Sequence, residues 1–455
     1  MYSAFSRHLP TGTQVMSAMA APTATATATA KVAAGTHFAQ VSPSDPPVSL
    51  EETQRVMGFA CDLSMKISRM PSFCHGFYGP QTPCNARKVV DYTNSIVDDM
   101  CAFGPAVDLD SQTPLLKPDA HANSIIYDNE HCTVFVDGAH VIKRFAHRPI
   151  EECLEQALKE CIFSSLISDK EDYIVLTHHI RLRDMKPCHY SRVGYSAQLE
   201  FTMKRFDQDL YSVLFKRPAQ IHRPSLVTRF QWVLECINIF ELYSLHGIIP
   251  GDPKPANIVL DADGHLRMID HEDNHFGKTW PKNFRAWFTV TYRPIECFPQ
   301  KSDTKATMLG ESSVVWVLGA IIYEIITEKP LVKLYPGASQ KEWDQNVQQE
   351  LFETFGQDAA TGAADSKDQK TRSKFDAFRD IAGEGLAQLL MQMLQYEASR
   401  RITLAEVFNH PMLKSMAART NLGDPKGPSQ KTKTISIFGN AEQAKTETDS
   451  KSASK

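Results

Sequence analysis

The apolar positions divide the chain into a strand-rich segment followed by a longer helical one. From about residue 123, the text SIIYDNEHCTVFVDGAHVIKRF places β-branched and aromatic runs between turn residues, with a hairpin signal at Asp137-Gly138. This pattern predicts three antiparallel strands. Residues 149–167 then read as a helix, and YSAQLEFTMKRF at 195–206 reads as a further strand.

After Pro224 the apolar residues recur at helical intervals. One face of a long helix is marked by Leu226, Val227, Phe230, Val233, Leu234, Ile237 and Phe240. Further helices are predicted at 314–327 and 386–394, and a polar insertion near 357–373 interrupts the helical region. The pattern therefore predicts an α+β fold with a small sheet-rich part and a larger, mostly helical part.

The flanks differ from this central region in composition. Residues 1–47 contain the repeat TATATATA and no acidic residue before Asp45, which predicts a disordered Ala/Thr-rich tail; a transit peptide is the alternative, although basic residues are few there. Residues 48–120 predict a helical N-terminal extension, which opens with capping-box spacing between Ser49 and Glu52. Residues 416–455, rich in Lys, Thr and Ser, predict a disordered polar tail.

Charge and cysteine usage narrow the class of protein. A formal charge of −4 on 455 residues argues against a dedicated nucleic-acid or membrane-surface protein. The longest apolar run, 314–323, is far shorter than the roughly 20 residues that a bilayer requires. The ten cysteines include no Cys-x-x-Cys pair, which indicates reduced thiols in an intracellular protein of the cytoplasm or nucleus. Cys74, His75 and Cys84 lack the second ligand pair of a typical zinc site.

One stretch, LHGIIPGDPKPANIVLDADGHLRMIDHED at 245–273, carries residues suited to phosphoryl transfer. Asp252 and Asn257 have D-x-x-x-x-N spacing, so one loop offers a carboxylate to a substrate hydroxyl and an amide oxygen to a metal. A hairpin signal at Asp263-Gly264 follows. Asp270 then ends an apolar strand, and its carboxylate suits Mg²⁺ on a nucleotide.

From about 123 to 414, the order of these motifs resembles a divergent eukaryotic-type protein kinase of the Ser/Thr type. The resemblance implies a two-lobed protein-kinase fold at 121–415. An N-lobe at 121–204 would hold a small antiparallel sheet and one main helix, and a C-lobe at 205–415 would be mostly helical. The uneven retention of motifs suggests a rapidly changing lineage, such as that of a viral kinase.

The resemblance also implies how the nucleotide is held. HVIK resembles the strand motif whose lysine, here Lys143, binds the α- and β-phosphates of ATP. Glu160 is the preferred helix partner of that lysine, and Glu155 and Glu152 are less suited.

In the same way, GDPKPAN resembles the catalytic loop, which implies Asp252 as the base and Lys254 as the charge partner of the transferred phosphoryl group. Asn257 and Asp270 are implied as ligands of Mg²⁺. ATP and Mg²⁺ are thus the implied cofactors, and proteins are the implied substrates.

Two further segments extend the resemblance. TVTYRPIE at 289–296 resembles the end of the activation segment, and YEASRRITLAEVFNHPML at 396–413 resembles the closing helix. Glu296 and Arg401 fall where the family keeps a buried ion pair between the two. Lys254 and Thr289 match Ser/Thr rather than Tyr kinases, which favours Ser or Thr hydroxyls as acceptors.

The glycine-rich phosphate loop of the family is missing. Gly138 is the only glycine between Asn123 and Lys143, and the first hairpin turn reads YDNEHC, with Asp128 and Glu130 near the expected phosphate positions. Glycines let backbone N–H groups approach phosphates closely. Their loss predicts either weak nucleotide binding or a differently shaped roof over the nucleotide.

Other substitutions fall around the catalytic residues. Pro250-Gly251 replace His-Arg, and without that arginine an active enzyme would not need a phosphorylated activation segment. Val314 replaces an Asp that would hydrogen-bond the catalytic-loop backbone, so the two losses match each other. His271 replaces the Phe of Asp-Phe-Gly, and it either fills the core or titrates and makes activity depend on pH. Glu272 replaces the Gly, and it either joins the metal site or faces water.

Three functions are consistent with these motifs. The first is an atypical Ser/Thr protein kinase that uses ATP and Mg²⁺, and the second is a pseudokinase that binds partners through the same fold. The third is a small-molecule phosphotransferase, because GDPKPAN and IDHED also resemble the loops of aminoglycoside and choline kinases. The sequence does not determine the substrate or the oligomeric state.

Overall fold

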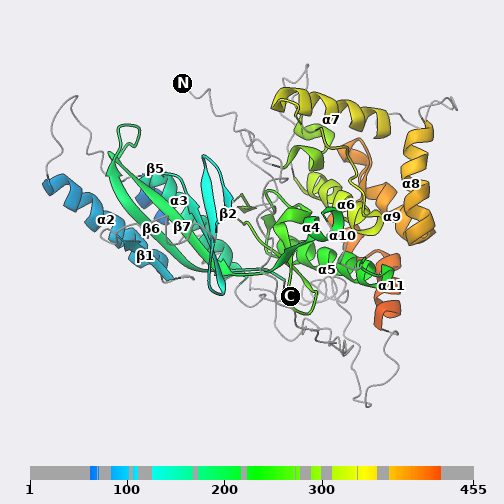
Figure 1. The fold of residues 1–455 in the computed structure, drawn as a ribbon, viewed down its shortest axis with the longest axis horizontal. Coiled ribbons are helices and arrows are strands. Elements are labelled where there is room, and N and C mark those ends of the chain that lie inside the picture. Colours follow the sequence, from blue (N-terminus) through cyan, green and yellow to red (C-terminus); the bar gives the residue numbers. More distant parts are fainter. Residues whose placement is uncertain are drawn as a thin grey trace, which may run out of the picture.

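A computed structural model describes twelve ranges of the chain: 62–68, 70, 83–101, 106–110, 125–167, 173–216, 223–271, 273–276, 288–298, 310–335, 337–355 and 368–421. The predicted tail at 1–47, the Ser49–Glu52 capping box, Cys74, His75 and Glu272 lie outside these ranges. The described part forms two lobes, one built on a sheet and one built of helices (Figure 1).

The sheet lobe has the strand order β1-β6-β7-β4-β3-β2, and every pair in it is antiparallel except β1–β6. The hairpin predicted at Asp137-Gly138 joins β3 to β4, with Gly138 at φ 58°. The three predicted strands are therefore confirmed. The strands are β1 (Ala106–Asp110), β2 (Ile125–Asp128), β3 (Cys132–Asp137), β4 (His140–Phe145), β6 (Thr177–Pro187) and β7 (Tyr195–Lys204), and the two-residue β5 (Arg148–Pro149) pairs with β7.

The longest strand, β6, is not among the predicted ones. Its text THHIRLRDMKP buries Ile180 and Leu182 at alternate positions, as a strand with one covered face does. Arg181 between them, and the buried Arg183 after them, obscure that period in the sequence.

One main helix, α3 (Ile150–Leu166), packs on the sheet and agrees with the helix predicted at 149–167. The N-terminal extension contacts this lobe at two places. α2 (Pro83–Cys101) lies against α3, and Arg192 donates to the carbonyls of Ile67 and Ser68 in the helical residues 62–68. Ile67, Ile96 and Met100 are almost completely buried in the same core as Leu154 and Leu158 of α3. The extension is thus part of the small lobe.

The extension also contains a strand, which the sequence does not predict. β1 pairs in parallel with β6, from Ala106 opposite His179 to Asp110 opposite Arg183, and so covers one edge of the sheet (Figure 1). The text AVDLD is too short for its alternation to stand out. The strand depends on the partner edge of β6 for its hydrogen bonds.

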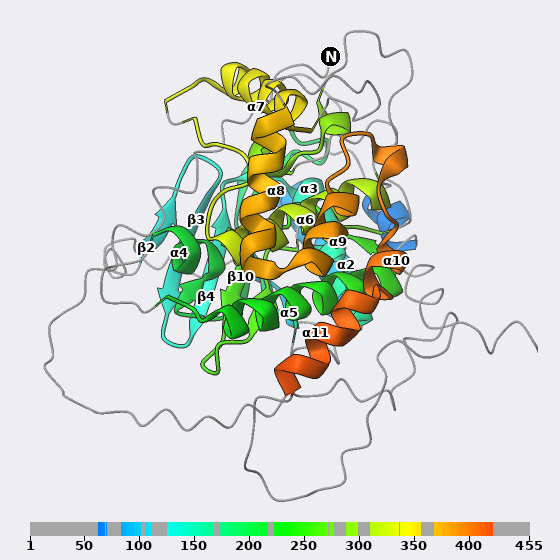
Figure 2. The same ribbon diagram turned by 90° about the vertical axis from the view of Figure 1, so that its right-hand side faces the viewer.

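The second lobe is built around α5 (Leu226–Leu245) and α6 (Glu311–Thr327) (Figure 2). α6 is covered on all sides, since Val314 through Thr327 are all buried, as expected for a helix in the middle of a core. The helices around this pair are α4 (Leu210–Phe215), α7 (Gln340–Phe355), α8 (Asp368–Ala382), α9 (Glu384–Met393), α10 (Leu404–Phe408) and α11 (Pro411–Asn421).

Short strands in this lobe hold the catalytic stretch in place. β8 (Gln208–Asp209), β10 (Ile258–Leu260) and β11 (Leu266–Met268) form one small sheet, and β9 (Ile248–Ile249) pairs with β12 (His275–Phe276). The hairpin predicted at Asp263-Gly264 joins β10 to β11.

Two helices of this lobe differ from the predictions. α8 begins at Asp368, inside the predicted polar insertion, because Phe375 and Phe378 supply a narrow buried face to an otherwise polar helix. α11 continues to Asn421, past the predicted end of the domain at residue 415. No helix in the described part of the chain has both the length and the apolar character to cross a membrane.

The buried ion pair predicted between Glu296 and Arg401 is confirmed. Two guanidinium nitrogens bind the two carboxylate oxygens at 2.5 and 2.9 Å, and the Arg401 side chain is 0% exposed. Arg401 also donates to the carbonyls of Ser312, Gln395 and Tyr396, and lies over the Trp316 ring. These contacts tie the end of the activation segment to α6 and to the C-terminal helices.

Replacement of Arg401 by Ala is expected to lower the free energy of unfolding by about 3–5 kcal/mol, because it leaves the Glu296 carboxylate buried without its partner. Urea unfolding measures the change. The matched control is Arg400→Ala, whose exposed pair with Glu397 predicts a loss under about 1 kcal/mol. Equal losses in the two variants would contradict the structural role assigned to Arg401.

Candidate active site

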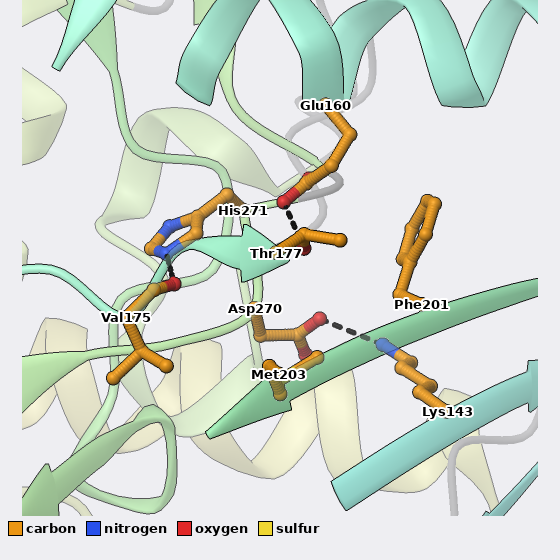
Figure 3. A pocket seen from close by; sticks show the side chains of 8 residues that line it. All are labelled: Lys143, Glu160, Val175, Thr177, Phe201, Met203, Asp270 and His271. Carbon is orange, nitrogen blue, oxygen red and sulfur yellow. Dashed lines mark hydrogen bonds and ion pairs between the residues drawn. The ribbon is translucent and has the colours of Figure 1, made fainter. Parts of the chain in front are cut away.

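A pocket between the lobes collects several of the predicted site residues (Figure 3). The Lys143 ammonium from β4 lies 2.7 Å from a carboxylate oxygen of Asp270, which follows β11. Glu160, from α3, accepts a hydrogen bond from the Thr177 hydroxyl at 2.5 Å. The predicted pairing of Lys143 with Glu160 stays a prediction. The pocket is lined by Lys143, Glu160, Val175, Thr177, Phe201, Met203, Asp270 and His271.

Asp270 has an unusual backbone conformation, with φ at 66°. A residue with a Cβ rarely adopts this left-handed region, which costs of order 1–3 kcal/mol and recurs at functional sites. Burial would raise the pKa of its carboxyl, but the Lys143 ammonium outweighs this and the net pKa is lowered. Asp270 is therefore held as an anion, aimed at the pocket.

The catalytic loop fixes the carboxylate of Asp252 from two sides. Lys254 donates to one of its oxygens at 2.5 Å, and the backbone N–H of Thr289 donates to the other at 2.7 Å. The Thr289 hydroxyl lies 3.1 Å from Asp252 and 3.0 Å from the Lys254 ammonium. Burial lowers the pKa of Lys254, but the adjacent Asp252 carboxylate outweighs it and raises the pKa overall. Lys254 therefore stays charged beside Asp252.

Asn257 lies in a 3₁₀ turn, Pro255–Asn257, directly before β10. Its side-chain amide donates to the Asp252 carbonyl at 2.9 Å, so its amide oxygen points away from that carbonyl. Its own carbonyl accepts from the N–H of Ile269, the residue before Asp270. Loop and strand are thereby joined so that Asn257 and Asp270 are held in one structural unit.

The donor set of Asn257 and Asp270 fits Mg²⁺. The ion prefers oxygen ligands and is commonly held by one or two protein side chains together with substrate phosphates. Within the described ranges no three His, Cys, Asp or Glu side chains gather into a metal site. Magnesium held together with phosphates is thus the metal chemistry that suits these residues.

His271 fills the core, which was one of the two predicted alternatives. Its ring stacks on Phe163 with centroids 4.1 Å apart, and its nitrogens lie 3.2 Å from the Tyr243 hydroxyl and 3.1 Å from the Val175 carbonyl. Burial lowers its pKa to about 4. The imidazole is therefore neutral at physiological pH and does not titrate there.

Gly251, which replaces an arginine of the family, is required by close packing. A Cβ added at Gly251 would lie 2.1 Å from the Asp273 carbonyl oxygen, which is far inside contact distance. The N–H of Gly251 donates to the Asn274 side chain at 3.1 Å. The backbone at 273–274 therefore lies directly on the catalytic loop. The sequence did not mark Asn274 as a site residue, because its role depends on this contact between distant segments.

The other end of the activation segment is also anchored. The Tyr292 hydroxyl donates to a carboxylate oxygen of Glu324 on α6 at 2.7 Å. Burial raises the pKa of Glu324 to about 8. Val314, at the start of the same helix, is 2% exposed in an apolar setting, so the loss of the family's Asp leaves no buried charge at that position.

The turn between β2 and β3 stands where the family has its glycine-rich loop. The side-chain oxygen of Asn129 accepts from the N–H groups of His131 and Cys132 at 2.8 and 2.7 Å. Asp128 binds Thr133, and Glu130 is 74% exposed. The turn thus has a shape different from that of a glycine loop, and weak nucleotide binding stays a prediction.

These features are those of a protein kinase, and the chain belongs to that family: residues 141–413 match the protein kinase domain. The two-lobed α+β fold predicted from the motifs is confirmed by this match and by the structure.

Several characterised kinases are similar to this chain. It is 22% identical over 227 residues to the Cyclin-dependent kinase 4 homolog of Caenorhabditis elegans, which covers 49% of this chain and 52% of that protein. It is 30% identical over 186 residues to Mitogen-activated protein kinase 6 of Oryza sativa subsp. japonica, covering 37% and 45% of the two chains. Mitogen-activated protein kinase p38a of Drosophila melanogaster is 30% identical over 183 residues, covering 38% and 46%. The chain spans about half the length of these relatives.

Replacement of His271 by Phe is expected to flatten the loss of stability in acid. In the wild type the unfolded imidazole binds a proton below about pH 6.5 and the folded one only below about 4. The free energy of unfolding therefore falls between these pH values, by up to about 3 kcal/mol.

Urea unfolding from pH 7 to pH 4 measures this difference. His140→Gln, at an exposed position in the β3–β4 hairpin, is the control and should keep the wild-type pH dependence. Parallel curves for wild type and His271→Phe would show that His271 does not carry the effect.

Proposed function

We propose that this protein is a serine/threonine protein kinase that transfers the γ-phosphoryl group of ATP to protein hydroxyls with the help of Mg²⁺. The observation that carries the proposal is the arrangement around Asp252. Its carboxylate is fixed by Lys254 and by the backbone of Thr289, at the junction of catalytic loop and activation segment. The similarity to cyclin-dependent and mitogen-activated kinases supports the same assignment.

The proposed roles follow from charge and position. Asp252 accepts the proton of the substrate hydroxyl. Lys254, whose ammonium lies 2.5 Å from the Asp252 carboxylate, offsets charge on the transferred group. The hydroxyl of Thr289 lies close enough to both to orient an incoming Ser or Thr. Magnesium, when bound, neutralises the phosphates and keeps them in line for transfer.

On the nucleotide side, Lys143 binds the α- and β-phosphates and Glu160 orients that lysine from α3. Asn257 and Asp270 hold Mg²⁺ through their side-chain oxygens. The Lys143 ammonium and the Asp270 carboxylate lie 2.7 Å apart, so each charge already has a partner in the pocket. When the nucleotide binds, phosphate would replace Asp270 as the partner of Lys143, and Mg²⁺ would replace Lys143 as the partner of Asp270. Neither charge would have to be desolvated alone. This exchange limits the electrostatic cost of binding.

Activity is proposed not to depend on phosphorylation of the activation segment. In the usual arrangement an arginine before the catalytic Asp binds the phosphate, whereas here the space beside Gly251 is filled by the backbone of Asp273. Asn274 and the pairing of β12 with β9 hold the start of the segment, and Tyr292 holds its end. Neutral hydrogen bonds thus replace a phosphate-dependent contact.

Asp252→Asn is expected to lower phosphate transfer by about 100-fold or more, because the amide cannot accept the substrate proton. Transfer of radiolabelled phosphate from Mg-ATP to generic Ser/Thr protein substrates measures it. The matched control is Asp263→Asn at an exposed hairpin position, which should transfer at the wild-type rate. Equal background transfer by wild type and Asp252→Asn would overturn the proposed activity.

A pseudokinase is the second candidate, and the turn between β2 and β3 favours it. Two of its backbone N–H groups bind Asn129, so they are not presented to a ligand. A small-molecule phosphotransferase has less support, because segment 289–296 is anchored to α6 and Arg401 as in protein-substrate kinases. Transfer to an aminoalcohol but not to protein would identify that third class.

Thermal unfolding separates the first two candidates. A ligand that binds the folded state raises the melting temperature, so millimolar Mg-ATP is expected to stabilise the wild-type protein. Asp270→Asn replaces a charged metal ligand by a neutral amide and is expected to reduce this shift. A melting temperature unchanged by millimolar Mg-ATP in the wild type would favour the pseudokinase.

A further inference from the structure

Tyr127, at the end of β2, lies on the pocket face of the sheet. One row of paired residues runs across four strands of the sheet, from β2 to β7. In order, it contains Tyr127, Val134, Lys143 and Phe201. Directly opposed residues in antiparallel strands project from the same face of a sheet. Lys143 and Phe201 line the pocket, so Tyr127 projects toward the same side, whereas its neighbour Asp128 projects to the other.

Asn129 holds the phenol of Tyr127 in one orientation and leaves its proton unused. The Asn129 oxygen accepts two backbone N–H groups, which fixes the amide, so its nitrogen must donate to the Tyr127 oxygen at 2.6 Å. The Tyr127 hydroxyl therefore accepts from Asn129 and keeps its own O–H for another acceptor. Among the described residues no acceptor of that proton is found.

The surroundings of this hydroxyl favour an anionic acceptor. Burial raises the pKa of Tyr127, and the ammonium groups of Lys254 and Lys143 act on it in the opposite direction, so the hydroxyl lies within electrostatic range of both. Lys143 is the residue proposed to bind the α- and β-phosphates, and Lys254 is the residue proposed to face the transferred group. A hydroxyl donor near two cations, with its proton available, suits a phosphate oxygen.

We propose that Tyr127, oriented by Asn129, is the roof of the phosphate site and donates its hydroxyl proton to a phosphate oxygen of the nucleotide. The side-chain donor takes over the task of the backbone N–H groups that a glycine-rich loop would present. Tyr127 and Asn129 stand at the positions of YDNEHC where the first two glycines of that loop would fall. This inference rests on the proposed nucleotide-dependent function and specifies how its phosphates are bound.

Isothermal titration of the full chain with Mg-ATP and, separately, with adenosine tests the proposal. Tyr127→Phe removes one oxygen atom and is expected to weaken Mg-ATP binding by about tenfold or more, since the lost hydrogen bond is made to a charged group. Adenosine has no phosphate, so its affinity should change by less than about twofold. The matched control is Tyr190→Phe, at a side chain that is 94% exposed, which should bind both ligands as the wild type does.

Three results would overturn the proposal. Equal Mg-ATP affinity in wild type and Tyr127→Phe would remove Tyr127 from the phosphate site and leave the proposed kinase function standing. Tighter Mg-ATP binding by Tyr127→Ala than by wild type would show that the ring blocks the site. If the wild type binds neither Mg-ATP nor adenosine, the proposed function and the role of Tyr127 fall together.

Discussion

The contact between Lys143 and Asp270 is the interaction on which the arrangement of the two lobes depends. The lysine belongs to the sheet lobe and the aspartate follows a strand of the helical lobe, so the ion pair spans the boundary. Backbone hydrogen bonds beside it join Met268 to Tyr173 and Val175, and His271 reaches the carbonyl of Val175. The ion pair in the pocket is thus flanked by neutral hydrogen bonds between the same two lobes, and these help to fix its geometry.

The residues that depart from the family motifs are accommodated by their surroundings. His271 stands where a phenylalanine is usual, and it retains an aromatic stack with Phe163 while its two nitrogens find partners. Gly251 stands where an arginine is usual, and the chain at Asp273 has moved into the space that a side chain would need. In both cases a residue that departs from the family motif is matched by the packing of a distant segment, Phe163 and Val175 for His271 and Asp273 for Gly251.

Sequence patterns predicted the parts of the structure whose signals are local. The strands around Lys143, the helices α3, α5 and α6, and the order of the site motifs all follow from periodicity, turn residues and short spacings. The Glu296–Arg401 pair could be predicted only through the resemblance to a family, because the two residues are far apart in sequence and no local pattern connects them. The strands and helices carry their signal within one short segment, whereas the ion pair joins two motifs that the family resemblance relates.

Other parts could not be predicted, because their structure depends on contacts between distant segments. β1 is five residues long and exists as a strand through the edge of β6. Asn274 matters because Gly251 lies against it, and the use of Tyr127 depends on the amide of Asn129. The binding of Lys143 to Asp270 likewise joins two motifs that the sequence shows separately.

The parallel pairing of β1 with β6 has a consequence for the order of folding. β1 is synthesised before β2, β3, β4 and α3, yet its partner strand follows all of them, so its pairing closes a long loop. Contacts of this kind form slowly, and domains tend to fold from the N-terminus as the chain emerges. β1 can therefore pair only after β6 has been synthesised. Until β6 is in place, the backbone N–H and C=O groups of β1 lack their partner strand, and in this period a nascent chain benefits most from a chaperone.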